Sequence, residues 1–552
     1  MPSRALPFSL TLSLSAVLTA SAAPLPHIVM VIVDDFGWAN VGYHRTPADD
    51  PTGEVQTPTM DLLVSQGVEL NQSYAFWYCS PSRSAIQTGR NPIHVNVNND
   101  GLAIHNPADP VSGYAGIPRN MTTIAWKMRE ANYSTLFVGK WHVGLATPDH
   151  SPFGRGWQNS EIYFDGANDY WTSISGSCPD GKKKQDMPIV DLWLTGNGTM
   201  PPSGAPNTRQ NNSWACSQSN QPSSCVYEDT FFVDKMLAAI AAHDPATPFF
   251  AIFAPHNIHA PLQVPADWLA KFKFIEDPRR QAYAAKVSWL DAQIGRIVDA
   301  LKAKGMWDNL LYVQTADNGG PIYDSGGAGA NNWPMRGGKT SNFQGGVRAN
   351  ALVSGGLIPQ ARRGQKEQGF VAVEDWFATF CALANVDPFD TRAAAAGLPP
   401  VDSVNLWPLL SGENSTSPHG EIVLGMPTIA SGNSYGDASI GVQGVIASDG
   451  YKLLIGKVHQ NVWTSPHYPN ASTSWDNAQF TDCSSGCLYN IFEDESEHHE
   501  LSASMPAKVA ELRARIAFHN ATMFRPDRGT DDGAGCAAAL GNCDGFWCPF
   551  LP

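Results

Sequence analysis

The stretch His27-Ile-Val-Met-Val-Ile-Val33, followed directly by Asp34-Asp35, decides the fold class of this chain. An apolar run rich in β-branched residues is typical of a strand that is buried on both faces of a parallel sheet. Open α/β sheets place their ligands at the carboxyl ends of such strands. The two carboxylates therefore predict a ligand site at the end of the first strand.

The same arrangement recurs three times further along the chain. Helices are predicted before or between these strands at residues 57–70, 122–130, 228–242 and 279–303. The alternation of strand, loop and helix predicts a doubly wound α/β sheet. The three further strands and the polar residues that follow them are Tyr133–Val138 with Lys140 and His142, Pro248–Ala254 with His256 and His259, and Asn309–Thr315 with Asp317 and Asn318.

The oxygen-bearing side chains at two strand ends suggest a metal site. Asp34, Asp35, Asp317 and Asn318 offer hard oxygen ligands, which suit Ca²⁺ or Mg²⁺ better than a transition metal. A solvated pair of acidic loop residues is the simpler alternative. Lys140 and His142 reach one anion if the chain turns between them, although such pairs are more often surface residues.

The segment Cys79-Ser-Pro-Ser-Arg83, which continues to Thr88-Gly-Arg90, predicts the start of a helix. Proline suits the first helical turn, and serine is a good N-cap. Cys79 would then lie at the positive end of the helix, where free N–H groups stabilise an anion or a reacting oxygen. A buried cysteine beside an ordinary helix is the alternative.

Length and composition restrict the class of protein. The chain has 552 residues, 43% hydrophobic and 16% charged, which indicates a folded protein with one large domain and a smaller one. A net charge of −15 argues against a nucleic-acid binder but leaves room for an anionic substrate in a locally basic pocket. Residues 1–23 read as a secretory signal peptide, and no later segment has the length of a membrane span. We expect secretion or delivery to a lysosome-like compartment.

Ten cysteines in such a compartment suggest disulfide bonds. Cys381, inside the apolar run Phe377–Leu383, is expected to stay outside them as a buried thiol, and Cys79 stays outside them if it is modified. The spacing gives no zinc site. Eight cysteines remain for up to four bridges of open connectivity: Cys178, Cys216, Cys225, Cys483, Cys487, Cys536, Cys543 and Cys548.

We expect a large α/β domain over residues 24–420 and a C-terminal subdomain over residues 421–552. Beyond residue 420 the apolar segments are shorter and alternate with polar residues. Residues 145–226 are turn-rich and are expected at the rim of a pocket. Their Lys182–Lys184 triplet is a solvated loop or a contact for a polyanionic substrate.

Several of these motifs resemble one family. Cys-x-Pro-Ser-Arg from Cys79, with the later Thr-Gly-Arg, resembles the signature of the type I sulfatases, and Gly139-Lys-Trp-His142 resembles their lysine-histidine segment. The run from His259 to Pro265 and residues 331–348 resemble arylsulfatases of the arylsulfatase B (N-acetylgalactosamine-4-sulfatase) type. The resemblance extends over residues 27–520, in the order of the family, and leaves the cysteine-rich tail 536–552 unmatched.

The resemblance implies an alkaline-phosphatase-like mixed sheet flanked by helices, with a C-terminal antiparallel sheet beside a helix. It implies that a formylglycine-generating enzyme oxidises Cys79 to Cα-formylglycine, whose hydrate is a gem-diol. The implied roles of the other site residues are these: Ca²⁺, or Mg²⁺, held by Asp34, Asp35, Cys79, Asp317 and Asn318; the sulfate bound by Lys140, His259 and Lys339; the diol oriented by Arg83 and His142.

The implied reaction is hydrolysis of a sulfate ester on an aryl compound, a sugar or a polysaccharide. One alternative is a phosphohydrolase of the same superfamily, but such enzymes carry Ser or Thr at the position of Cys79 and bind two zinc ions. The other is a catalytically inactive, glycan-binding protein with a sulfatase fold. Such a protein is expected to have lost a metal ligand or the lysine-histidine pair, and none of these is missing here.

Overall fold

The computed structural model describes residue 1 and residues 24–99, 101–180, 185–196, 204–207, 216–323, 328–425, 441–474 and 479–552. Residues 2–23 of the predicted signal peptide and the Lys182–Lys184 triplet lie outside the described residues. Among the helices described, none combines the length and apolar character needed to cross a membrane.

Ten strands form one mixed sheet in the order β10-β9-β6-β5-β11-β1-β12-β13-β2-β14. The five central strands, from β6 to β12, are parallel, while β13 and β9 pair antiparallel with their neighbours. This confirms the predicted fold class and all four predicted strands. The bounds are β1 His27–Val33, β2 Val68–Leu70, β5 Ser134–Lys140, β6 Asn159–Tyr163, β9 Trp193–Thr195, β10 Ala205–Pro206, β11 Phe249–Ala254, β12 Leu310–Ala316, β13 Ala351–Ser354 and β14 Gln365–Glu367.

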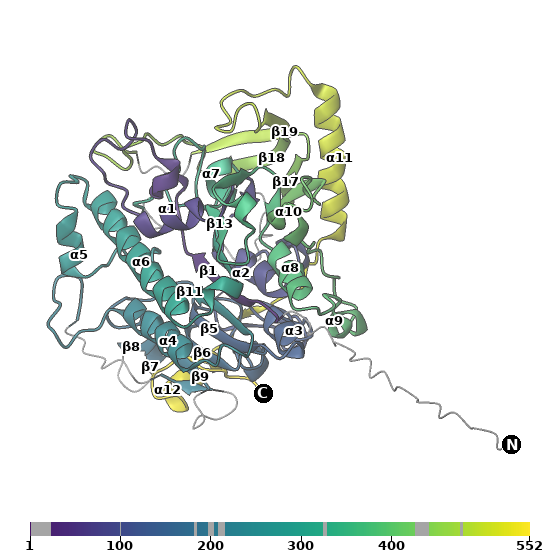
Figure 1. Ribbon diagram of the computed structural model, residues 1–552. Coiled ribbons are helices and arrows are strands. Elements are labelled where there is room, and N and C mark those ends of the chain that lie inside the picture. Colours follow the sequence, from purple (N-terminus) through teal and green to yellow (C-terminus); the bar gives the residue numbers. More distant parts are fainter. Residues whose placement is uncertain are drawn as a thin grey trace.

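Helices flank this sheet, with α4 and α6 packed together on one side and α2, α3 and α8 on the other (Figure 1). The long α6 begins where the Asp277 carboxylate accepts the N–H groups of Arg279 and Arg280, with Pro278 in the first turn. The helices of the large domain are α1 Pro58–Ser65, α2 Cys79–Thr88, α3 Ile124–Glu130, α4 Glu228–Ala242, α5 Ala266–Lys271, α6 Pro278–Ala303, α7 Gln344–Val347, α8 Asp375–Leu383, α9 Thr391–Ala395 and α10 Trp407–Ser411.

The predicted helix over residues 57–70 is wrong in its second half. Helix α1 ends at Ser65, and residues 68–70 form β2, which pairs antiparallel with β13. Between them, a methyl group on Gly67 would lie 2.0 Å from the carbonyl oxygen of Val353. The pairing with a strand almost 300 residues away decides the conformation here, and no local pattern reveals it.

A smaller antiparallel sheet follows, as predicted. It contains β16 Glu421–Gly425, β17 Val442–Ala447, β18 Tyr451–His459 and β19 Phe480–Asn490, and helix α11 Pro506–Thr522 lies beside it (Figure 1). After α11 the chain returns to the large domain. Helix α12 (Ala534–Gly541) and the buried Trp547 belong to the hydrophobic core of that domain.

The disulfide bonds confirm the expected division of the cysteines. The bridges are Cys178–Cys536, Cys216–Cys225, Cys483–Cys487 and Cys543–Cys548. Cys79 and Cys381 are free and buried.

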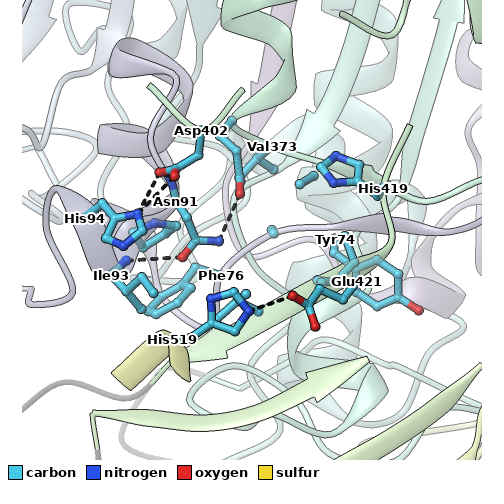
Figure 2. A pocket seen from close by; sticks show the side chains of 16 residues that line it. Tyr74, Phe76, Asn91, Ile93, His94, Val373, Asp402, His419, Glu421 and His519 are labelled. Atoms are coloured by element: carbon cyan, nitrogen blue, oxygen red, sulfur yellow. Dashed lines mark hydrogen bonds and ion pairs between the residues drawn. The ribbon is translucent and has the colours of Figure 1, made fainter. Parts of the chain in front are cut away.

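A cavity of about 160 Å³ lies between the large domain and the small sheet (Figure 2). Three histidines line it, and each is paired with its own carboxylate. His94 contacts Asp402 at 2.9 Å, His519 contacts Glu421 at 2.7 Å and His419 contacts Asp375 at 2.5 Å. Because each imidazole already contacts a carboxylate, we interpret the residues around this cavity as polar contacts between the large domain and the small sheet.

The contacts of Glu421 with His519 and Arg515 make the free energy of unfolding depend on pH. Hydrogen bonds from His519 and then Arg515 lower the pKa of Glu421 from 4.5 to about 2. The stabilising charge of Glu421 is therefore fully present above about pH 4.5 and is lost as the pH falls towards 2. We expect Glu421→Gln to be less stable than wild type by ~1 kcal/mol or less at pH 6, because solvent screens the pair, and to match it near pH 2. Urea unfolding at both pH values measures this; a constant difference would contradict it.

Candidate functional site

The predicted site residues meet at one edge of the large sheet. Strands β5, β11, β1 and β12 are adjacent and parallel, so their carboxyl ends lie side by side. These four ends deliver Lys140, the His256–His259 turn, the Asp34-Asp35 pair and Asp317-Asn318. The structure therefore brings these polar side chains together at one edge of the sheet, and their roles stay predictions.

Cys79 is the first residue of α2, as the Pro81 signal predicts. Tyr78 before it is extended, and the helix turns the side chain of Cys79 towards the strand ends. The thiol is 1% exposed and its Sγ lies 3.8 Å from Oδ1 of Asp34. Burial raises the pKa of this thiol to about 12, so an unmodified Cys79 is a poor nucleophile.

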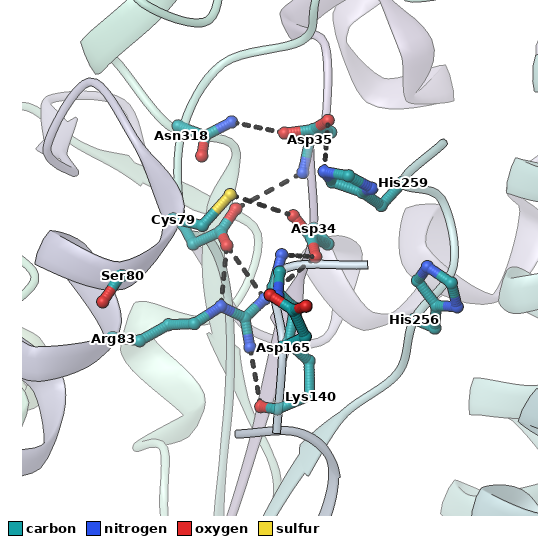
Figure 3. Close-up of polar contacts among 12 residues, drawn as sticks. Asp34, Asp35, Cys79, Ser80, Arg83, Lys140, Asp165, His256, His259 and Asn318 are labelled. Carbon is teal, nitrogen blue, oxygen red and sulfur yellow. Dashed lines mark hydrogen bonds and ion pairs between the residues drawn. The ribbon is translucent and has the colours of Figure 1, made fainter. Parts of the chain in front are cut away.

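One turn along α2, Arg83 contacts three of the strand ends (Figure 3). Its Nε donates to Oδ2 of Asp317 at 2.9 Å, and Nη2 lies 2.8 Å from the same oxygen and 3.3 Å from Oδ2 of Asp34. Nη1 donates to the carbonyl of Lys140 at 3.0 Å. The guanidinium thus fixes α2 against β1, β12 and β5.

Two lysines neutralise the Asp34-Asp35 pair. Lys140 Nζ donates to Oδ2 of Asp34 at 2.6 Å, and Lys339 Nζ lies 2.7 Å from Oδ1 of Asp35. Burial opposes the charge of Asp34, but the cations led by Lys140 outweigh it and hold its pKa well below the usual range. Burial likewise opposes the charge of Lys339, and Asp35 outweighs it and raises the lysine pKa. Asp34 and Lys339 are therefore ionised.

His259 faces the same cluster. Its Nδ1 lies 2.7 Å from the carbonyl of Ala260, and this contact places the proton on Nδ1. The free Nε2 then faces Lys339 Nζ at 3.1 Å and Oδ2 of Asp35 at 3.5 Å. Burial, and then Lys339, lower the pKa of His259 to about 4, so the imidazole is neutral at neutral pH.

The neighbouring His256 points elsewhere. Its Nδ1 lies 3.3 Å from Oε2 of Glu228, and its ring stacks on Tyr170 at 3.8 Å. Sequence spacing alone leaves the two histidines hard to separate. The structure directs His259, and not His256, to the Asp35 and Lys339 side chains.

His142 lies beside the cluster in a left-handed conformation, with φ of +52°. Its backbone N–H donates to the carbonyl of Phe164 at 3.1 Å, and Gly166 packs against its ring. Burial and the charge of Lys140 lower its pKa well below the usual value. No direct contact joins His142 to Cys79 in the described structure, so its predicted role stays a prediction.

Two acidic residues next to the site escaped sequence analysis. Asp165 lies near Lys140 and Arg83 (Figure 3), and burial raises its pKa to about 6. Asp191 is fully buried behind it, where burial and the charge of Asp165 raise its pKa to about 7. The only sequence signal is an isolated acid after each of two short apolar runs, Ile162–Phe164 and Ile189–Val190.

The donor atoms fit a bound cation. One ligand atom each from Asp34, Asp35, Cys79 and His259 lie within 4.8 Å of one another. Oδ1 of Asn318 is buried and has no hydrogen-bond partner among the described residues, which suits a metal ligand. Both oxygens of Asp317 already accept hydrogen bonds, Oδ2 from Nε of Arg83 and Oδ1 from the backbone N–H of Asp35. Mainly carboxylate and amide oxygens favour Ca²⁺ or Mg²⁺.

The chain is similar to known proteins in sequence and in fold. The family model described as Sulfatase matches residues 26–386. Arylsulfatase J of Mus musculus is 30% identical over 90% of this chain and 76% of its own length. N-acetylgalactosamine-6-sulfatase of Homo sapiens is 28% identical over 71% of this chain and 67% of its own length.

Solved structures agree on the fold. The crystal structure of Ps i-CgsB in complex with k-i-k-neocarrahexaose has a TM-score of 0.67 at 23% identity, and covers 94% of this chain and 99% of its own. Phosphonate monoester hydrolase of Agrobacterium radiobacter has a TM-score of 0.53 at 15% identity, and covers 90% of this chain and 95% of its own.

Proposed function

This chain belongs to the sulfatase family and is a sulfuric ester hydrolase, and we propose that it acts through a Cα-formylglycine at position 79 and a bound Ca²⁺. The observation that carries the proposal is the convergence of three buried cations on one cysteine at the sheet edge. Arg83, Lys140 and Lys339 are each at most 4% exposed, and their charges are balanced by the carboxylates of Asp34, Asp35 and Asp317.

The proposed modification solves the problem of an inert thiol. One hydroxyl of a hydrated aldehyde at residue 79 would attack sulfur while the bond from sulfur to the alcohol oxygen breaks. The second hydroxyl would then lose its proton and re-form the aldehyde as the bond from carbon to the sulfate oxygen breaks. The start of α2 directs backbone N–H groups at this residue. Arg83, held by Asp317 and Asp34, keeps α2 and therefore residue 79 in place against the strand ends.

The cations stabilise the charge that grows on the sulfuryl oxygens. When bound, Ca²⁺ would polarise a sulfate oxygen and favour the ionised hydroxyl. Lys140 contacts Asp34 and Lys339 contacts Asp35 at the border of the site. Both ammonium groups are therefore placed to bind the oxygens of an anionic ester. His259 Nε2 carries no proton and lies 3.1 Å from the protonated Lys339 Nζ; we assign to this pair a relay in which Nζ gives a proton to Nε2 and Nε2 passes it to the leaving alcohol.

We propose a sulfated carbohydrate as the natural substrate. One support is that a relative is named as an N-acetylgalactosamine-6-sulfatase. The other is that residues 259–265 and 331–348 resemble the corresponding segments of the N-acetylgalactosamine-4-sulfatases. Sulfate release from an aryl sulfate tests the reaction. Release from 4-sulfated against 6-sulfated N-acetylgalactosamine then tests the linkage, and hydrolysis of the aryl ester alone would contradict the carbohydrate proposal.

The secretory pathway is the proposed location. Four disulfide bonds fit an oxidising compartment, and a formylglycine-generating enzyme is the partner that the modification requires during synthesis. Secretion by a eukaryotic host, with loss of residues 1–23 from the mature protein, is the expected result. Retention of these residues on the mature protein would contradict it.

The metal proposal has a readout that is independent of turnover. Because a ligand that binds the folded state raises its stability, we expect Ca²⁺ added to chelator-treated protein to raise the melting temperature. Asn318→Ala removes the unpartnered Oδ1 and should shift the Ca²⁺ midpoint to at least about 10-fold higher concentration. An unchanged melting temperature at millimolar Ca²⁺ and Mg²⁺ would contradict the site.

A further inference from the structure

The cysteine-rich tail has a place in the fold that its sequence leaves unexplained. Cys536 on α12 is bridged to Cys178, 358 residues earlier, in strand β7 (Ile174–Asp180). The buried Trp547 and Cys548 belong to the core of the large domain. The tail is therefore attached to the turn-rich residues 145–226, which follow the Lys140–His142 segment.

Backbone hydrogen bonds extend this attachment towards the site. The N–H groups of Phe550 and Leu551 donate to the carbonyl of Ala146, at 3.0 and 2.8 Å. The N–H of Val190 donates to the carbonyl of Gly545 at 2.9 Å, and the N–H of Trp547 returns to the carbonyl of Val190 at 3.0 Å. The tail thus holds the residue that precedes Asp191.

The side chain of Asp191 continues the connection. Its two carboxylate oxygens accept the N–H groups of Phe164 and Asp165, each at 2.8 Å. The hydroxyl of Ser175 also donates to this carboxylate, and the Nε1–H of Trp547 donates to that hydroxyl at 2.9 Å. Asp191 is completely buried, so no solvent competes for these contacts.

Residues 164–166 form the turn that Asp191 holds, and this turn packs against His142. The N–H of His142 donates to the carbonyl of Phe164 at 3.1 Å, and the N–H of Trp141 donates to that of Tyr163 at 2.9 Å. A methyl group on Gly166 would lie 3.0 Å from Cε1 of His142, so the turn packs directly on the imidazole. The left-handed conformation of His142 leaves it dependent on such support.

We propose that Asp191 is a positioning residue for His142, and that the cysteine-rich tail, residues 536–552, keeps Asp191 in place. The inference rests on the proposed role of His142 in orienting residue 79. Asp191 touches no substrate. It acts by fixing the turn 164–166, and through that turn the direction of the imidazole.

The test compares Asp191→Asn with a matched variant elsewhere. Asp291 is also buried and also accepts two backbone N–H groups, those of Thr59 and Met60, at 3.0 and 2.9 Å. Both Asn variants put an amide NH₂ opposite an N–H and should lose similar stability. Because small displacements at a reacting centre cost up to about 100-fold in rate, Asp191→Asn should lower kcat for an aryl sulfate by ~10- to 100-fold, with KM changed by less than about 2-fold.

Asp291→Asn should keep wild-type kcat. Rates are expressed per aldehyde-containing, folded molecule, so that incomplete modification does not count as lost catalysis. Equal kcat values in the two variants, or a loss of Asp191→Asn that appears in KM alone, would overturn the proposal. An inactive wild-type enzyme would instead contradict the proposed function.

A second variant tests the tail separately. Trp547→Phe keeps the aromatic ring and removes the N–H that reaches Ser175, which should lower kcat by about 5-fold or less. Added to Asp191→Asn, it should cause no further loss, because both act through one carboxylate. Trp463→Phe is the control, since its indole N–H donates to the carbonyl of Ser496 in the small domain. Additive losses would show that the tail does not act through Asp191.

Discussion

Cys79→Ala is expected to abolish hydrolysis of aryl sulfates, with kcat lowered by about 10⁴- to 10⁶-fold. The side chain of alanine cannot be oxidised to an aldehyde, so the nucleophile is lost while the other metal ligands and the cations remain. Initial rates with an aryl sulfate at saturating concentration measure the effect. Binding of an aryl sulfate by the variant should survive, because Lys140 and Lys339 are unchanged.

The matched control is the other free cysteine. Cys381 is also fully buried, on α8, and has no part in the site. Cys381→Ala should reduce stability through the small cavity it leaves and keep wild-type kcat. Substantial turnover by Cys79→Ala, in protein free of other sulfatases, would contradict the proposed chemistry.

Lys140→Met is expected to lower kcat/KM by about 10²- to 10³-fold. The variant removes the ammonium that we assign to the sulfuryl oxygens and leaves the buried carboxylate of Asp34 without its 2.6 Å partner. Steady-state kinetics at pH 5 to 7 measure the loss.

Lys452 provides the control for the structural part of this effect. Lys452 and Glu497 form a buried pair at 2.7 Å, both completely buried, in the small domain. Breaking either buried pair should cost about 3–5 kcal/mol of stability, but Lys452→Met should retain wild-type kcat/KM per folded molecule. Equal catalytic losses in the two variants would show that Lys140 serves the fold alone.

The strand ends explain why sequence predicts so much of this site. Each buried strand gives a clear local pattern, and its carboxyl end must lie beside those of its parallel neighbours. Asp34, Lys140, His259 and Asp317 therefore meet wherever the four strands are adjacent. The start of α2 at Cys79 also has a local signal in Pro81, although the N-cap residue is Tyr78 and not one of the predicted serines.

Long-range contacts account for the remainder. Residues 68–70 form a strand because β13 pairs with them, and the tail lies beside Val190 because of backbone bonds and a disulfide that joins distant positions. Asp191 is one acidic residue in a turn-rich excursion, with no spacing that relates it to His142. Only the folded chain shows that its two oxygens hold the turn under that histidine.

The charge balance connects stability with function at this site. Three cations and three carboxylates are buried together, and each compensates the desolvation cost of another. An anionic substrate and a divalent cation would enter as a further pair of opposite charges. We therefore expect that, if the proposed metal binds, the site exchanges internal ion pairs for contacts with the ester and this metal.

The mass of the tryptic peptide that contains residue 79, from protein that hydrolyses an aryl sulfate, tests the central proposal most directly. Cleavage after Arg45 and Arg83 yields this peptide as residues 46–83. We predict a mass lower than the sequence gives by the difference between a CH₂SH group and a CHO group, and reaction of the peptide with a hydrazide. A fully active preparation in which residue 79 is an intact thiol, alkylated after unfolding, would contradict the proposed mechanism.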